Sequence, residues 1–127
     1  MVRYLLDTHI FIWWLEGSEQ LTTEAYDIID DDNNEIFVSA AVSWEIAIKR
    51  AKGHLTFQGD SVQQMQEQSF LPLSMMHAHA QQVEHLPEIH RDPFDRIQIA
   101  QAQVEDLTFI THDEMIWQYP DVELLKV

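Results

Sequence analysis

Short apolar runs alternate along the chain with longer stretches in which apolar residues recur at helical spacing. The first short run, residues 2–6, is rich in β-forming residues and ends at Asp7; residues 8–16 then favour a helix that stops at Gly17. The predicted strands are 2–6, 36–39, 70–73 and 107–111, with 122–125 as a candidate edge strand. The predicted helices are 8–16, about 21–29, 41–52, 61–69, 75–85 and about 93–106, with one short turn at 114–118.

This alternation of strands and helices predicts an α/β fold. Strands separated by helices are joined by right-handed crossovers and lie parallel, so we expect a three-layer sandwich with a central, mostly parallel sheet. Three glycines and four prolines punctuate the chain without clustering, and the length of 127 residues is typical of one domain. We therefore predict a single domain over residues 1–127, with its ligand at the carboxyl ends of the strands.

The composition removes several classes of protein. There is no cysteine, which excludes disulfides, a thiolate zinc site and a cysteine nucleophile. The longest apolar run, residues 10–15, is far shorter than the roughly 18 residues that a membrane span needs. No secretory leader is recognisable at the start of the chain, so we expect a cytoplasmic protein without a membrane partner.

The charge is strongly negative, with 22 acidic residues against 7 lysines and arginines and a net charge of −15. Proteins that coat nucleic acid are usually basic, because neutralisation of phosphates supplies much of their affinity. The charge therefore argues against a duplex-coating protein. It remains compatible with an enzyme that approaches phosphates through bound metal ions, since carboxylates are natural ligands of hard cations such as magnesium.

Four acids stand at or near the predicted carboxyl ends of the strands. Asp7 directly follows the first strand, Asp113 comes two residues after strand 107–111, and Glu45 and Asp95 lie in the first turns of helices. Such charges repel by about 1 kcal/mol or more per pair at short range. A divalent cation would offset that repulsion, and it would also activate water for cleavage of a phosphodiester bond.

Each acid has an ordinary structural explanation when it is taken alone. Asp7 and Asp113 are candidates to cap the elements that follow them, and Asp95 suits the dipole of a first helical turn. Glu45 is four residues before Lys49 and has the spacing of a surface ion pair. The four positions together favour a shared site, because all four fall at one edge of the predicted sheet.

Asp92 and Asp95 are expected to have different roles. Proline suits the first position of a helix, so Pro93 makes Asp92 the N-cap and Asp95 the third helical residue. An N-cap carboxylate bonds the N–H groups of the first turn, whereas Asp95 remains free to meet a cation. We therefore predict that Asp95 is the ligand and Asp92 the structural cap.

Four segments resemble one known family over essentially the whole chain. They are YLLDTHIFIWWL (4–15), VSAAVSWEIAIKRAKGHL (38–55), LPEIHRDPFDRIQIAQA (86–102) and LTFITHDE (107–114). The sequence is similar in these segments, and in their order, to the PIN-domain ribonucleases, in the branch of VapC-type toxins of type II toxin–antitoxin pairs. The HRDPFDR block is the most specific part of the resemblance.

The resemblance implies a PIN-like nuclease domain that hydrolyses RNA as an endoribonuclease. The matching acids, Asp7, Glu45, Asp95 and Asp113, would form its magnesium-binding active site, with Asp7 and Asp95 as metal ligands and Mn²⁺ as a substitute for Mg²⁺. An antitoxin protein and a second copy of the chain would be its partners.

The alternatives to this function are a non-catalytic PIN-like module and a receiver-like regulatory module. A receiver needs adjacent acids after its first strand and a lysine that ends a late strand, and neither is present.

Residues outside the acids carry further expectations. Thr8 and Thr111 flank Asp7 and Asp113, so their hydroxyls are candidates to bond a ligand carboxylate or simply to cap a helix. His90 and Arg91 would contact phosphate at the mouth of the site or pack in a loop. The segment 10–15 is apolar on every side of its helix, which predicts contact with another chain and supports a homodimer. Other large apolar side chains, Trp44, Met75, Met76 and Trp117, are expected in the core.

Overall fold

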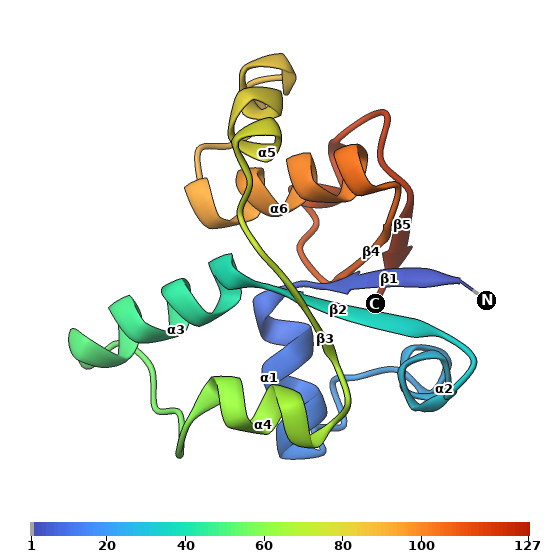
Figure 1. Cartoon of the computed structure of the whole chain (residues 1–127), viewed down its shortest axis with the longest axis vertical. Helices are drawn as coiled ribbons and strands as arrows, with labels where there is room; N and C mark the ends of the chain where they lie inside the picture. The colour runs from blue at the N-terminus through green and yellow to red at the C-terminus, as the bar shows by residue number, and fades with distance from the viewer. Residues whose placement is uncertain (1) are drawn as a thin grey trace.

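The chain folds into one parallel β-sheet between two layers of helices (Figure 1). The computed structural model describes residues 2–127. The strands are β1 (Arg3–Leu6), β2 (Glu35–Ser39), β3 (Leu71–Leu73), β4 (Thr108–Thr111) and β5 (Leu124–Lys126). The α-helices are α1 (Thr8–Glu16), α2 (Thr23–Asp30), α3 (Ala40–Ala51), α4 (Ser61–Glu67), α5 (His77–Gln82) and α6 (Pro93–Glu105). Two short 3₁₀ turns, η1 (Val83–His85) and η2 (Ile116–Gln118), complete the fold, so the helix expected over 75–85 is divided between α5 and η1.

The strand order is β3-β2-β1-β4-β5, and every neighbouring pair is parallel. The prediction of an α/β sandwich around a parallel sheet is thereby confirmed. The chain leaves β1 towards β2 and β3 and returns on the other side with β4 and β5, which makes β1 and β4 the point where the order reverses. In receiver domains the first strand lies between the second and third, so the receiver-like alternative is wrong.

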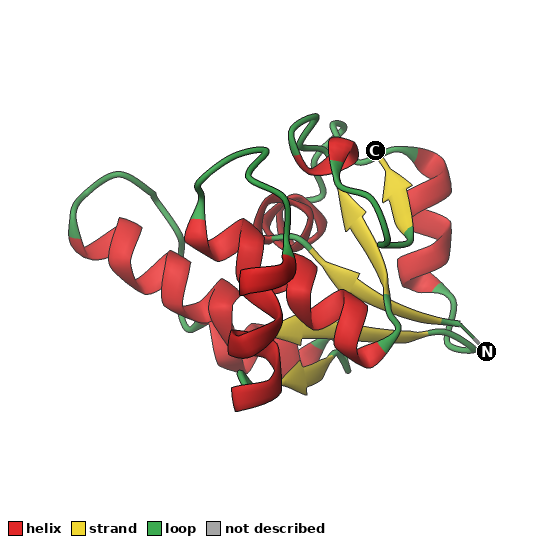
Figure 2. Ribbon diagram, turned by 90° about the horizontal axis from the view of Figure 1, so that it is seen from above, coloured by secondary structure: helices red, strands yellow, loops and turns green. Residues whose placement is uncertain are grey.

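The sheet is covered on both faces because its central strands are apolar on both sides. Leu5 and Leu6 are both fully buried and belong to different clusters, as do Phe109 and Ile110 in β4. In Figure 1, α1, α2 and α4 lie on one side of the sheet and α5 and α6 on the other, and Figure 2 shows the strands enclosed by helices. Successive side chains of a strand point to opposite faces, so continuous apolar runs are what a sheet buried on both faces requires.

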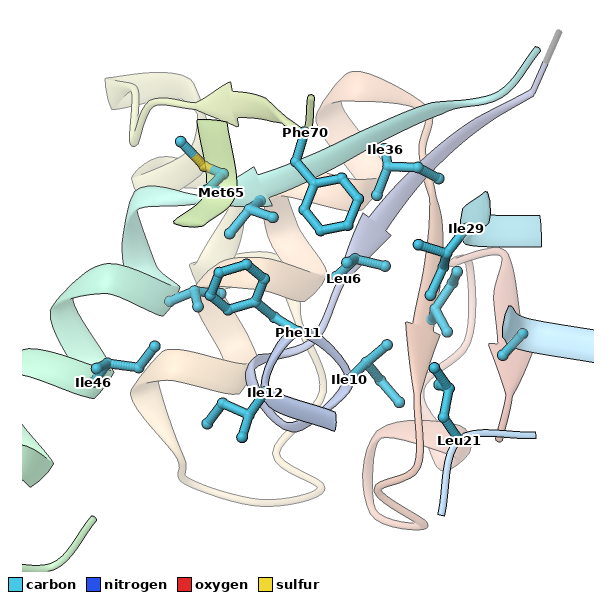
Figure 3. Close-up of a cluster of buried hydrophobic side chains, with 14 residues drawn as sticks. Leu6, Ile10, Phe11, Ile12, Leu21, Ile29, Ile36, Ile46, Met65 and Phe70 are labelled. Atoms are coloured by element: carbon cyan, nitrogen blue, oxygen red, sulfur yellow. The ribbon is translucent and has the colours of Figure 1, made fainter. Parts of the chain in front are cut away.

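Helix α1 fills the centre of one apolar layer. Ile10, Phe11 and Ile12 are buried and meet residues from β2, α3, α4 and the segment before β3 (Figure 3). Trp13 and Trp14, which follow, are half-buried and pack against the same cluster. The layer formed by α2, α3 and α4 thus covers the first half of segment 10–15 within one chain, and contact of its half-buried second half with another chain stays a prediction.

Three side chains expected in the core lie at the surface. Trp44, Met75 and Met76 expose 48%, 43% and 58% of their area, and Trp117 is half-buried. The apolar character of these side chains favoured burial, but Trp44 lies on the outward face of α3, and Met75 and Met76 lie in the loop before α5.

Within residues 2–127, none of the helices has the length and apolar character needed to cross a lipid bilayer.

Candidate active site

The site forms where β1 and β4 end side by side. The N–H of Asp7 donates to the carbonyl of Ile110 at 3.0 Å, which extends the β1–β4 ladder by one residue. This contact brings Asp7 level with Thr111, the last residue of β4. The segments that follow the two strands, α1 and η2, pack on opposite faces of the sheet, which is the arrangement at which open α/β sheets bind ligands.

Asp7 is held firmly by two threonines. Its Oδ1 accepts the backbone N–H of Thr8 at 2.8 Å, and its Oδ2 accepts the hydroxyl of Thr111 at 2.7 Å. Asp7 is thus the N-cap of α1, and its second oxygen is also held at the end of β4, so the capping role does not exclude a role in the candidate site. Burial raises the pKa of Asp7 to about 6, and these hydrogen bonds limit the increase.

Glu45 is connected to Asp7 through Thr8. The hydroxyl of Thr8 donates to Oε1 of Glu45 at 2.7 Å, and the ammonium group of Lys49 donates to Oε2. The expected pair one helical turn apart is present, but Glu45 is buried rather than solvated, with 5% of its area exposed. Hydrogen bonding to Glu45 raises the pKa of Lys49, so the lysine remains a cation beside the acids.

The predicted difference between Asp92 and Asp95 agrees with the geometry. Oδ1 of Asp92 accepts the N–H groups of Phe94 and Asp95 at 2.9 and 3.1 Å, and Pro93 is the first residue of α6. Asp92 is therefore the N-cap. Asp95 is buried one turn further on and makes no capping contact.

We expect Asp92→Ser to retain most of the stability of the protein and Asp92→Ala to lose about 0.5–2 kcal/mol, because serine also caps a helix whereas alanine cannot. Urea unfolding of the two variants measures the difference. Loss of function in Asp92→Ser at full stability would instead make Asp92 part of the site.

The electrostatic potential at Asp95 is strongly negative. Burial is the main cause that raises its pKa to about 9. Neighbouring carboxylates raise it further, in decreasing order those of Asp7, Asp92, Asp113 and Glu45. The four acids singled out in the sequence are therefore close enough to interact as charges, which is the situation that a bound cation relieves.

Three side chains converge closely enough to bind a single ion. One donor atom each from His90, Asp95 and Asp113 lies within 4.8 Å of the others. Carboxylate oxygens suit a hard divalent cation, and such an ion takes few protein ligands and retains water, so these residues fit it. Asp7 is outside this group, and its role as a ligand stays a prediction.

His90 is in the group although the sequence suggested only a phosphate contact or a loop-packing role. Its Nε2 lies 3.0 Å from Oδ2 of Asp95 and its Nδ1 lies 2.7 Å from the hydroxyl of Tyr119. Tyr119 is buried after η2 and also accepts a hydrogen bond from Arg96. No sequence signal indicated Tyr119, because it lies outside the motifs, five residues after segment 107–114, and joins the site only through the fold.

Comparisons with known proteins agree with this architecture. A family model described as the PIN domain matches residues 4–121. No curated protein matches the chain in sequence. Among solved structures, VapBC2 from Rickettsia felis bound to a DNA fragment from their promoter is 15% identical, with a TM-score of 0.70 and coverage of 98% of this chain and 98% of that chain.

Two other structures are similar over nearly their full length. DNA-bound VapBC from Salmonella typhimurium is 17% identical, with a TM-score of 0.70 and coverage of 99% of this chain and 98% of that chain. A toxin–antitoxin complex from Klebsiella pneumoniae is 21% identical, with a TM-score of 0.64 and coverage of 97% and 96%. At these identities the likeness establishes the fold, and the PIN-like architecture expected from the sequence is confirmed.

Proposed function

The chain belongs to the PIN-domain family, whose model spans residues 4–121, and on this premise we propose that it is a metal-dependent endoribonuclease. The reaction would be hydrolysis of RNA phosphodiester bonds, with Mg²⁺ as the cofactor and Mn²⁺ as a substitute. The chain would be the toxin of a toxin–antitoxin pair and would act in the cytoplasm. The remaining alternative is a PIN-like module that only binds partners.

The observation that carries the proposal is the burial of several carboxylates around one point. Asp95 has a pKa raised to about 9 by burial and by the neighbouring acids. A purely structural protein gains nothing from this repulsion, which destabilises the fold. Strongly perturbed acids in one cleft are typical of functional sites, and a divalent cation is the group that offsets them.

Each residue of the site would have a different role in the reaction. When bound, a divalent cation supplies charge that polarises the phosphate and assists the attack of water on phosphorus. Asp95 and Asp113, with Asp7, would hold that cation. Glu45, which accepts hydrogen bonds from Thr8 and Lys49, would accept the proton of the attacking water, and Lys49 would contact a phosphate oxygen.

The substrate would approach over the segment that precedes α6. An open cleft of about 560 Å³ is lined there by Glu88, Ile89, His90, Arg91 and Arg96. Arg91 is exposed in this cleft, whereas Arg96 donates to the carbonyl of Pro87 at 2.8 Å. With a net charge of −15, the chain offers few cations for a long duplex, which favours a short single-stranded stretch of RNA.

Incubation of the purified chain with single-stranded RNA tests the proposal. We expect cleavage with Mg²⁺ or Mn²⁺, and none with EDTA or in an Asp7→Asn variant. Matched single-stranded DNA and double-stranded RNA determine the substrate class. Absence of metal-dependent cleavage of any of these nucleic acids would favour the non-catalytic module.

The proposed partner is an antitoxin that covers the acidic side chains at the carboxyl ends of β1 and β4. The similar structures described above are VapBC and toxin–antitoxin complexes, and the negative charge of this chain suits a basic or arginine-bearing segment. An arginine side chain placed against Asp95 and Asp113 would occupy the position of the cation. Such a segment would inhibit the enzyme by competing with the metal ion.

We also propose that the chain is a homodimer. The half-buried end of segment 10–15 supports this proposal, and so do the exposed apolar side chains Trp44, Met75 and Met76, which a second copy would cover. Sedimentation equilibrium at micromolar concentration should give about twice the chain mass of 14.9 kDa. A mass of one chain over a wide range of concentration would contradict the dimer.

A further inference from the structure

Asp95 differs from the other acids in how its carboxylate is held. Asp7 accepts two hydrogen bonds and Glu45 is fixed from both sides by Thr8 and Lys49. Within residues 2–127, the side chain of Asp95 has one hydrogen-bond partner, Nε2 of His90, at 3.0 Å. The orientation of Asp95 therefore depends on His90, whose side chain is largely buried, with 13% of its area exposed.

The direction of this hydrogen bond follows from groups further from the site. Arginine has only donors, so the N–H of Arg96 at 2.8 Å must occupy a lone pair of the Tyr119 oxygen. The hydroxyl hydrogen of Tyr119 is then free for another acceptor. Nδ1 of His90 lies 2.7 Å from this oxygen, an ordinary distance for an O–H···N bond.

A neutral imidazole carries one hydrogen on one of its two nitrogens. If Tyr119 donates to Nδ1, the hydrogen of His90 is on Nε2 and points at Asp95. We propose that Arg96, Tyr119 and His90 form a directed chain of hydrogen bonds that fixes this tautomer and holds one oxygen of Asp95, leaving the other to bind the cation. His90 is thus a positioning residue for the proposed metal site, and this inference rests on the proposed function.

If the hydrogen bonds ran in the opposite direction, fewer polar atoms of this chain would have a hydrogen-bond partner. With the hydrogen on Nδ1, Tyr119 would accept from both His90 and Arg96, and its own hydrogen would have only the carbonyl of His90, at 3.5 Å. The lone pair of Nε2 would then face a carboxylate oxygen 3.0 Å away. A carboxylate that binds a metal ion is ionised and has no hydrogen to share, so this arrangement is repulsive in the working site.

The inference also separates His90 from the ligands. His90 lies near Asp95 and Asp113, but its Nε2 is committed to Asp95 as a donor. The cation would therefore take oxygen ligands, and His90 would act on it through Asp95. Outer partners of this kind commonly change metal affinity by about 10–100-fold when they are removed.

A double-mutant cycle with Mn²⁺ as the probe tests the chain. Glutamine has no tautomers, and its amide N–H can lie where Nε2 of His90 lies in the wild type. His90→Gln should therefore bind Mn²⁺ within about threefold of wild type. His90→Leu, which has no donor, should bind Mn²⁺ about tenfold or more weakly. Tyr119→Phe should weaken binding in the wild-type background and have no further effect in the His90→Gln background. Calorimetric titration measures all affinities, and circular dichroism verifies that each variant is folded.

Exposed residues provide matched controls. Tyr26→Phe and His85→Gln make the same chemical changes on the surface and should leave Mn²⁺ affinity unchanged. An equal loss for Tyr119→Phe in both backgrounds would overturn the proposal, because the effect would then not pass through the tautomer of His90. Equal affinities of His90→Leu and wild type would overturn it as well.

Nitrogen-15 NMR of the Mg²⁺-saturated protein, in which Asp95 is ionised, at a pH where His90 is neutral provides an independent measurement of the tautomer. We expect the shifts of an unprotonated Nδ1 and a protonated Nε2, and the reverse pattern would refute the directed chain. These measurements do not need RNA. A positive cycle without nuclease activity would therefore leave the positioning role intact and reject the proposed function, whereas cleavage with no coupling would do the opposite.

Discussion

Replacing Asp7 by asparagine or Glu45 by glutamine is expected to lower RNA cleavage by at least about a hundredfold, the scale at which positioned acidic groups contribute to catalysis. Each change removes a charge and preserves the volume of the side chain. The backbone N–H of Thr8 can still donate to an asparagine at position 7, and the hydroxyl of Thr8 can still donate to a glutamine at position 45. The fold should therefore survive, so that the loss reports on the chemistry of the site.

Initial rates on a fluorogenic single-stranded RNA with excess Mg²⁺ measure the effect. Helix α2 supplies matched controls, since Asp27→Asn and Glu24→Gln make the same substitutions at exposed positions and should cleave as wild type. A variant of Asp7 or Glu45 that cleaves at the wild-type rate would remove that residue from the site.

Asp95→Asn should raise the melting temperature in EDTA and reduce the stabilisation gained from added Mg²⁺ or Mn²⁺. Without a cation, Asp95 must either carry a charge among like charges or retain a proton that the unfolded chain releases, and asparagine avoids both costs. With a cation at a hundredfold excess over its Kd, binding stabilises the native state by about 2.7 kcal/mol, and the variant loses much of this gain. Thermal melts with and without metal measure both effects. An identical gain in variant and wild type would rule out Asp95 as a ligand.

The same variant should alter the pH dependence of stability in EDTA. The folded-state pKa values of Asp7 and Asp95, about 6 and about 9, both lie above the ordinary value of 3.8 for this side chain. As pH rises from about 4, the unfolded chain releases protons that the folded chain retains, so the free energy of unfolding falls. In wild type this decline continues towards pH 9, and in Asp95→Asn the part due to residue 95 is absent. The free energy of unfolding, measured with urea at each pH, should therefore differ between Asp95→Asn and wild type by an amount that grows from pH 4 to pH 9.

Local physical rules predicted the elements and the caps well. Asp92 was identified as an N-cap because Pro93 lacks an N–H and has the backbone angle of a first helical residue, and both facts belong to the sequence alone. The position of Asp7 at the carboxyl end of the sheet was predicted because a strand ends immediately before it. These inferences need only the neighbouring residues, and for that reason they were reliable.

Contacts between distant segments were beyond such rules. The role of Tyr119 depends on a loop that returns beside His90, and no property of residue 119 signals that return. The exposure of Trp44 depends on which side of α3 faces the sheet, and the apolar pattern of that helix did not decide it. The burial of Ile10, Phe11 and Ile12 within one chain could not be predicted for the same reason, since their cover comes from separate helices.

The pairing of β1 with β4 has a consequence for synthesis of the protein. Asp7 and Thr111, which meet across this pair, are 104 positions apart, and β4 lies near the end of the chain. At roughly 5–20 residues per second, the ribosome needs roughly 5 to 20 s to progress from one to the other. During that interval β1 has only β2 as a neighbour, and Asp113 does not yet exist. A nascent or prematurely terminated chain therefore lacks the complete set of acids, and the proposed activity appears only when translation is almost finished.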